Sequence, residues 1–166
     1  IPPSNEYIFL PLTRLYIKMK VTRNDGTNLP PATNFSVANI LPHTLFKQID
    51  VEIGGVNTSS QDQMYPYKAY LETLLSYPDM DGGHLTSCSG YIMDDPRRFD
   101  AQENAAYELR RAGLVASQTM DFCIPLHCDI LQSVKVIPGN TSMKFTLSRN
   151  TDAFSFIAPD DADLKI

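Results

Sequence analysis

The sequence predicts a mostly β protein, all-β with short helical insertions, arranged as a sandwich or barrel. Apolar and polar residues alternate in several short runs, which is the period of a strand with one buried and one exposed face. Twelve prolines and eight glycines separate these runs, as is typical of a fold with many short strands and turns. At 166 residues the chain has the size of one domain with a single core.

Five alternating runs are the predicted strands. In the second run, Ile49, Val51 and Ile53 are expected to be buried. The intervening Gln48, Asp50 and Glu52 are expected to be exposed. Turns are predicted at the Asp-Gly pair of residues 25–26 and at the Gly pair of residues 54–55, because both tolerate positive φ. The predicted strands are residues 14–22, 47–53, 119–124, 142–148 and 153–157.

A helix is predicted over MYPYKAYLETLLSYP, residues 64–78. Pro66 suits the first helical turn, and Pro78 cannot continue a helix. One face carries apolar residues at helical spacing, and this face is expected to pack on the β body. Its members are Tyr67, Tyr70, Leu71, Leu74 and Leu75.

A second helix is predicted to begin at Asp100, which forms a capping-box-like pattern with Glu103, and to end at Gly113. Its apolar face is thin, so we expect the helix to lie at the surface. The members of that face are Ala105, Ala106 and Leu109, with Tyr107 nearby.

Four tyrosines in or beside the first helix are the candidate interface residues. They exceed what one helical face can bury, so some of them are expected to contact another element or another chain. One explanation of these tyrosines is packing within the domain, with each hydroxyl in contact with water or a backbone carbonyl. The other is an assembly contact, because tyrosine is enriched in protein interfaces. The four residues are Tyr65, Tyr67, Tyr70 and Tyr77.

No catalytic, metal or cofactor site is predicted, and the protein is not expected to be an enzyme. Cys123, His127 and Cys128 lie close in sequence but lack the paired spacing of a zinc site. Cys88 near His84 is the only local candidate for a nucleophile and base, and a small structural residue explains it better. One set of charged residues is interpreted as a solvent-exposed loop in which acidic and basic side chains balance each other's charge. Its members are Asp94, Asp95, Arg97, Arg98 and Asp100.

Composition excludes several classes of protein. The net charge is −5 and the basic residues are scattered, so nucleic-acid binding is not expected. No apolar run is long enough to cross a bilayer. Three cysteines, an odd number, argue against a disulfide framework and for a reducing compartment. The sequence starts without Met and ends in an interrupted alternation, ADLKI, so we expect it to be a piece of a longer protein.

Specific segments resemble the major capsid protein of Polintons (Mavericks), the virus-like integrated DNA elements of animal genomes, and of adintovirus-like viruses. Residues 40–55, ILPHTLFKQIDVEIGG, are similar to a short helical segment followed by a strand in that family. The helix at residues 64–78 and the HLTSC at residues 84–88 follow in the same order. Residues 125–157 are similar to a later passage of the family, so the resemblance covers most of the chain.

The resemblance implies an antiparallel jelly-roll β-sandwich of the viral capsid type, as in adenovirus hexons and tectivirus capsids. Residues 1–166 would form a single jelly-roll domain, the N-terminal half of a double jelly-roll protein. Such proteins form trimers that serve as pseudo-hexagonal capsomers of an icosahedral shell, so the expected partners are copies of itself and other capsid proteins. The expected location is the virion capsid, assembled in the nucleus or cytoplasm of the host cell.

Two alternatives stay open. One is a single jelly-roll penton or minor capsid protein, whose assembly would be five-fold. The other is a β-sandwich ligand-binding module or cupin-like enzyme, which would need a cluster of His and Glu on inward strand positions.

Overall fold

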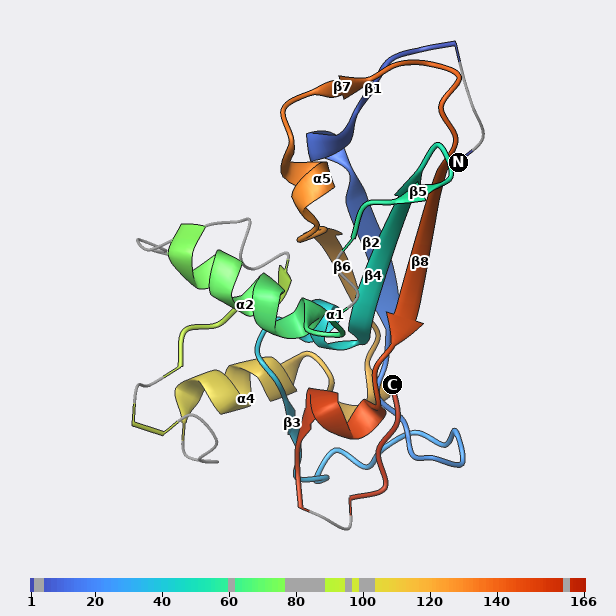
Figure 1. Ribbon diagram of the computed structural model, residues 1–166. Coiled ribbons are helices and arrows are strands. Elements are labelled where there is room, and N and C mark those ends of the chain that lie inside the picture. The colour runs from blue at the N-terminus through green and yellow to red at the C-terminus, as the bar shows by residue number, and fades with distance from the viewer. Residues whose placement is uncertain (2–4, 60–61, 77–88, 95–96, 99–103, 160–161) are drawn as a thin grey trace. The chain divides into compact units, whose positions relative to one another are not determined.

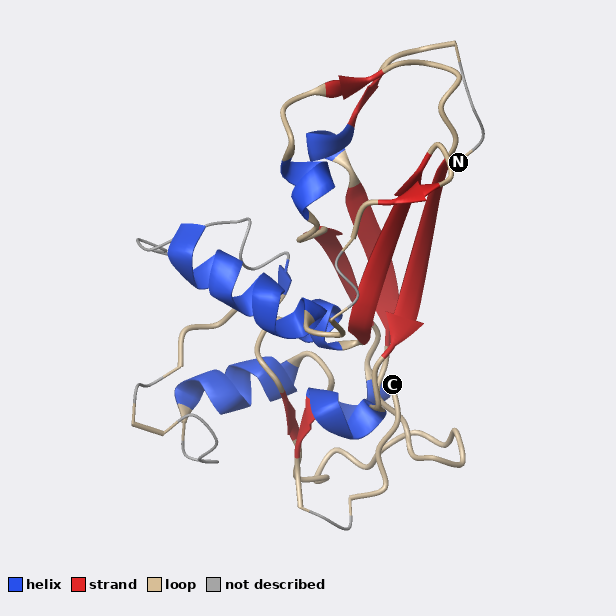
Figure 2. Ribbon diagram, in the orientation of Figure 1, coloured by secondary structure: helices blue, strands red, loops and turns tan. Residues whose placement is uncertain are grey.

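Helix and strand are present in nearly equal amounts. The computed structural model describes residue 1 and residues 5–59, 62–76, 89–94, 97–98, 104–159 and 162–166. Of these residues 28% are helical and 29% are in strands, so the fold is mixed and the all-β expectation is not confirmed (Figure 2). Across the described ranges the strands form small antiparallel sheets and no barrel. The jelly-roll sandwich therefore stays a prediction.

The chain forms two compact units, each made from three separate segments. Unit 1 consists of Ile1–Leu15, Phe46–Asp79 and Ile124–Asn150, and unit 2 of Tyr16–Leu45, Met80–Cys123 and Thr151–Ile166. The elements of unit 1 are β1 (Ile8–Phe9), η1 (Leu10–Leu12), β4 (Phe46–Ile53), β5 (Val56–Asn57), α2 (Tyr65–Ser76), α5 (Asp129–Gln132), β7 (Val136–Ile137) and β8 (Met143–Arg149).

Unit 2 contains the remaining elements. Strands β2 (Arg14–Met19) and β6 (Met120–Pro125) pair with each other, and most of both strands belongs to this unit. The other elements of unit 2 are β3 (Ser36–Val37), α1 (Leu41–Thr44), α4 (Ala105–Ala112), η2 (Val115–Ser117), η3 (Asp152–Ser155) and β9 (Phe156–Ile157).

The sheet of unit 1 has the strand order β5-β4-β8, with antiparallel pairing throughout (Figure 1). Gly54 and Gly55 both have positive φ and make the predicted turn between β4 and β5. Ile49 and Val51 are buried as predicted, whereas Ile53 is half-buried. Strand β8 confirms the fourth predicted strand, and its register places Val51 opposite Phe145.

Gln48 corrects the prediction for β4, because it is buried rather than exposed. Its side-chain carbonyl accepts the backbone N–H of Gln63 at 2.9 Å, and its amide donates to Oδ1 of Asp50 at 2.7 Å. A polar side chain can be buried where its hydrogen-bonding groups are satisfied. The alternating pattern identifies the strand correctly but does not show that a loop will cover its second face.

Helix α4 of unit 2 begins at Asn104, whose side chain caps the helix by accepting the N–H of Ala106 at 3.0 Å. The predicted end at Gly113 is confirmed, whereas the predicted cap at Asp100 and Glu103 lies outside the described residues. Helix α4 lies at the surface as expected, with Ala105 and Leu109 exposed, but its inner face differs in part from the predicted one, because it packs on β3 and buries Tyr107 and Arg110.

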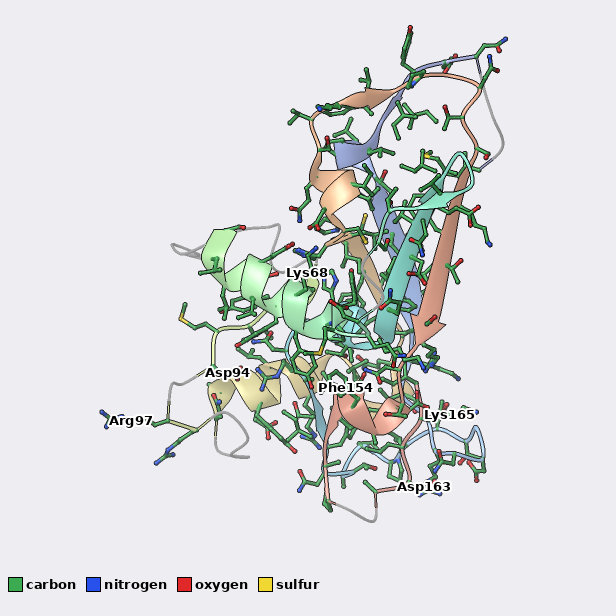
Figure 3. All side chains as sticks on the ribbon, in the orientation of Figure 1. Lys68, Asp94, Arg97, Phe154, Asp163 and Lys165 are labelled. Atoms are coloured by element: carbon green, nitrogen blue, oxygen red, sulfur yellow. The ribbon has the colours of Figure 1, made fainter. Side chains whose placement is uncertain are left out.

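An ion pair within unit 2 corrects the interpretation of the charged loop. Oδ1 of Asp94 lies 2.6 Å from Nη1 of Arg110, and these side chains are 11% and 2% exposed. The other carboxylate oxygen of Asp94 accepts from Asn39 at 3.2 Å. Figure 3 labels Asp94 beside α4. Asp94 is therefore a largely buried structural partner of α4 rather than a solvated loop residue.

The first and last predicted strands have different outcomes. Along β2 and the residue pair after it, Met19 and Val21 are buried while Tyr16 and Lys18 are exposed, as predicted. Residues 153–157 are not one strand, because the 3-10 helix η3 occupies most of them and only β9 pairs, with β3. The hydroxyl of Thr44 donates to the buried Ser155 hydroxyl at 2.9 Å, which ties η3 to α1.

Candidate interaction surface

Helix α2 is confirmed over Tyr65–Ser76, but it packs through a different face from the predicted one. The helix contacts β4, and three of its buried side chains lie four residues apart, so they form one stripe along the helix. Tyr65 is 6% exposed, and Ala69 and Thr73 are also buried. The Thr73 hydroxyl donates to the Ala69 carbonyl at 2.7 Å, so this polar residue is satisfied inside the helix. The buried stripe of α2 therefore consists of one tyrosine and two small side chains.

A polar flank of α2 is held by the segment that leads into α5. Nδ1 of His127 lies 2.7 Å from Oε2 of Glu72, and the Gln132 amide donates to the same oxygen at 2.7 Å. Lys68, labelled in Figure 3, forms an ion pair with Asp129 and lies 3.8 Å from Glu72. Burial alone would lower the pKa of Lys68, but the Asp129 carboxylate raises the pKa above its ordinary value.

These polar contacts explain why the predicted face is wrong. Glu72 and Lys68 lie beside the stripe of Tyr65, Ala69 and Thr73, so pairing them with residues 127–132 sets the rotation of the helix about its axis. The sequence shows the Lys68/Glu72 pair at i, i+4, but nothing in it signals partners more than fifty residues away.

The rotation leaves a run of large apolar side chains at the surface of unit 1. They follow one another at three- and four-residue spacing, so they share one side of the helix. We call this set the α2 outer face. The members and their exposed fractions are Met64 53%, Tyr67 53%, Leu71 56%, Leu74 38% and Leu75 80%.

An exposed stripe of this kind is informative because single exposed apolar residues are ordinary, whereas contiguous apolar patches mark interaction surfaces. In α2 the side chains of Tyr65, Ala69 and Thr73 are buried and the three leucines are exposed. A helix that only covers a sheet would instead bury its leucines. The α2 outer face is therefore the candidate interaction surface of unit 1.

The four predicted interface tyrosines have different positions. Tyr65 is buried inside unit 1, and burial raises the pKa of its phenol, so it is removed from the candidate set. Tyr67 belongs to the α2 outer face, and Tyr70 is half-buried beside it. Tyr77 lies outside the described residues. Sequence reasoning missed Met64, which has the spacing of the same stripe.

Cys128 lies in the wall of a small cavity of about 30 Å³ in unit 1, together with His127, Lys68 and Tyr65. Burial raises the pKa of the Cys128 thiol to about 11, against a smaller opposing effect of Lys68. A thiol that stays protonated at neutral pH is a poor nucleophile and a poor metal ligand. Its Sγ instead faces the Ile49 carbonyl at 3.9 Å. Cys128 is thus a structural residue.

The sequence also raised a metal site and a cysteine nucleophile as candidates. For the described residues, no three His, Cys, Asp or Glu side chains come together as a ligand set for a metal ion. His84, Cys88, Asp95 and Asp100 lie outside the described residues.

Each unit also contains a cavity larger than the one beside Cys128. One, of about 360 Å³, is an open cleft of unit 1 whose polar wall includes Glu72, His127 and Arg14. The other, of about 170 Å³, lies in unit 2 and is mainly apolar, with Tyr91, Phe122 and Leu114 in its wall.

None of the helices that the structure describes combines the length and the hydropathy that a membrane-spanning segment requires. Comparisons with protein-family models, with curated proteins and with solved structures find no match to this chain.

Proposed function

We propose that this chain is a structural building block of a viral capsid and that it assembles with copies of itself. The observation that carries the proposal is the α2 outer face, which is apolar and exposed. It lies in the segment whose sequence most specifically resembles the capsid proteins of Polintons. The proposed body is an antiparallel jelly roll, the first of two in the whole protein.

The proposed role is mechanical and involves no catalysis. In a closed symmetric shell each contact is repeated many times, so modest interfaces suffice for a stable assembly. A specific interface buries about 1,600 Å² in total, and its fully buried centre is more apolar than its rim and enriched in aromatic residues. Tyr67, Leu71 and Leu75 would form such a centre in a trimeric capsomer within the virion shell, assembled in the nucleus or cytoplasm of the host cell.

The experiment is light scattering coupled to size exclusion on the protein that contains this chain. We expect trimers, and we expect Leu71→Glu and Leu75→Glu to convert them to folded monomers, because a carboxylate would be desolvated in the contact. Ser76→Glu is the matched control, since it adds the same charge on the polar flank of the same helix. Trimers that persist in both leucine variants, or monomers in the unchanged protein, contradict the proposal. Pentamers favour the penton alternative.

A ligand-binding module is a second candidate, and the apolar cavity of about 170 Å³ in unit 2 favours it. A cavity of about 150 Å³ lined by apolar side chains is known to bind benzene in an engineered protein. Titration with benzene and toluene, followed by NMR shifts of the Phe122 and Leu114 signals, tests this candidate. Saturable shifts confined to the cavity support it, and their absence excludes it.

A further inference from the structure

The cleft of about 360 Å³ in unit 1 has no part in the proposed assembly. Its volume is within the range of about 300–1,000 Å³ that is typical of small-molecule sites. Three segments contribute to its wall: residues 11–14, the second half of α2 and residues 125–132. All three belong to unit 1, so one compact unit contains the whole cleft.

Arg14 supplies the cationic group of the wall. Its Nη1 donates to the carbonyls of Pro11 at 2.8 Å and Thr13 at 2.9 Å, and these two bonds hold the guanidinium plane in place. Both acceptors are neutral, and among the described residues no carboxylate forms an ion pair with Arg14. The guanidinium also carries N–H donors on Nε and Nη2, and their planar fork fits the two oxygens of a carboxylate.

Glu72 supplies the anionic group of the wall, and its oxygens already have partners. Its Oε2 lies 2.7 Å from both His127 and Gln132, and its Oε1 lies 3.8 Å from Nζ of Lys68. Lys68 also pairs with Asp129, but the Asp129 side chain is 86% exposed and is not part of the wall, so water screens its charge. The wall therefore favours an anionic ligand, which would pair with Arg14, over a cationic one.

Part of the wall is apolar. Leu126 and Leu131 are 7% and 4% exposed, and Pro11 and Pro125 are half-buried. In small-molecule sites the apolar side chains bind the body of the ligand, whereas a few polar groups fix its orientation. A ligand that fits both parts of this cleft has one carboxylate group and an apolar ring or branched chain.

We propose that the cleft binds a small organic carboxylate with an apolar body. The carboxylate pairs with the guanidinium of Arg14, and the body packs on Leu126 and Leu131. Because Arg14 is exposed, water competes for the guanidinium and the affinity is modest. The site uses the cleft and not the α2 outer face, so it stands or falls separately from the proposed function.

NMR titration of the protein with benzoate tests the proposal, because benzoate has an apolar ring and is ionised at neutral pH. We expect saturable shifts of the Leu126 and Leu131 methyl signals and of the Gln132 side-chain amide, with a dissociation constant on the order of 1 mM. Benzamide keeps the ring and lacks the charge, so it should bind about tenfold more weakly. Benzylamine carries the opposite charge and should bind more weakly still.

Four outcomes of the titration overturn the proposal. One is the absence of saturable shifts with tens of millimolar benzoate. Equal affinities for benzoate and benzamide would show that the guanidinium takes no part, and a preference for benzylamine would show that Glu72 dominates the cleft. Saturable shifts at Phe122 and Leu114, in place of those in the cleft, would assign benzoate to the apolar cavity of unit 2.

Variants of Arg14 test the pairing. Arg14→Lys keeps the positive charge and loses the planar fork, so the affinity for benzoate should fall while that for benzamide stays unchanged. Arg14→Gln loses both, and its affinity for benzoate should fall about tenfold, to that of benzamide. Unchanged benzoate binding by Arg14→Gln contradicts the proposal.

A second pair of variants leaves the bonds of Arg14 with Pro11 and Thr13 intact, so it tests the charge even where the Arg14 variants do not fold. Ser76→Glu adds a negative charge to the wall and should weaken benzoate binding severalfold. Ser76→Gln is the matched control, because it adds a side chain of the same size without the charge. Equal benzoate affinities of these two variants would contradict an anion site in the cleft.

Discussion

Nδ1 of His127 lies 2.7 Å from Oε2 of Glu72, and this contact joins the middle of α2 to the residues that precede α5. The histidine side chain is 9% exposed and the glutamate 27%, so the contact is partly shielded from water. Gln132 donates to the same carboxylate oxygen. The Glu72 carboxylate therefore holds the polar flank of α2 against the segment of residues 127–132, and the leucines of the helix are left outside.

The first prediction concerns this contact. Glu72→Ala removes the acceptor of both His127 and Gln132, so we expect the free energy of unfolding to fall by about 1–2 kcal/mol. Urea denaturation followed by circular dichroism measures it. Glu108→Ala is the matched control, because Glu108 is 57% exposed and its carboxylate lies 3.3 Å from Arg111 within α4. Its effect should stay within about 0.5 kcal/mol. Equal effects of the two changes would contradict the assigned role of Glu72.

The second prediction tests which face of α2 is inside. Ala69 is fully buried, so Ala69→Leu should overpack its surroundings and cost about 1–3 kcal/mol. Leu75→Ala removes a largely exposed side chain and should change stability by less than about 0.5 kcal/mol. Thermal and urea unfolding of both variants, measured at a concentration where the protein is monomeric, decides the question. A larger loss in Leu75→Ala than in Ala69→Leu would restore the face predicted from the sequence.

The third prediction concerns the ion pair of unit 2. Asp94→Asn leaves the buried guanidinium of Arg110 without its carboxylate, and breaking such a pair costs about 3–5 kcal/mol. The double change Asp94→Asn with Arg110→Met removes the charge as well, so it should be more stable than Asp94→Asn alone. A double-mutant cycle by urea denaturation measures the coupling. Strictly additive effects would show that the two side chains do not interact in solution.

The fourth prediction concerns alkaline pH. Burial raises the pKa of Cys128 from 9.0 to about 11 and also raises the pKa of Tyr65 above 10.0. The unfolded chain releases these protons first, so the stabilisation from Cys128 is complete below about pH 9 and is lost as the pH rises through 9–11, whereas that from Tyr65 begins to fall only above about pH 10. Each proton contributes at most about 1.4 kcal/mol per pH unit.

Urea denaturation at pH 8, 9 and 10 measures this slope. Cys128→Ala should make the decline between pH 9 and 10 shallower, because the buried thiol no longer titrates. Cys123→Ala is the control, since Cys123 is exposed on β6 and its removal should leave the slope unchanged. Identical slopes in all three proteins would show that Cys128 is accessible to solvent.

Local patterns in the sequence predicted the elements of this protein well where a short segment carries the whole signal. The alternation of β4 and β8, the Gly54-Gly55 turn and the extent of α2 all follow from side chains a few residues apart. The 3-10 helix η3 was missed because residues 153–157 also alternate, and its pairing of Ser155 with Thr44 joins residues more than a hundred positions apart.

What the sequence determined by itself is the chemistry available on each element: strands with one apolar face, and a helix with three leucines and two charged residues. Only the tertiary structure decided which face of α2 is inside, because that depends on His127, Asp129 and Gln132, which reach the helix from a distant segment. Periodicity ranks faces by hydropathy, whereas the folded chain also satisfies its buried hydrogen bonds and ion pairs. In α2 those polar contacts set the rotation, and the apolar face was left at the surface.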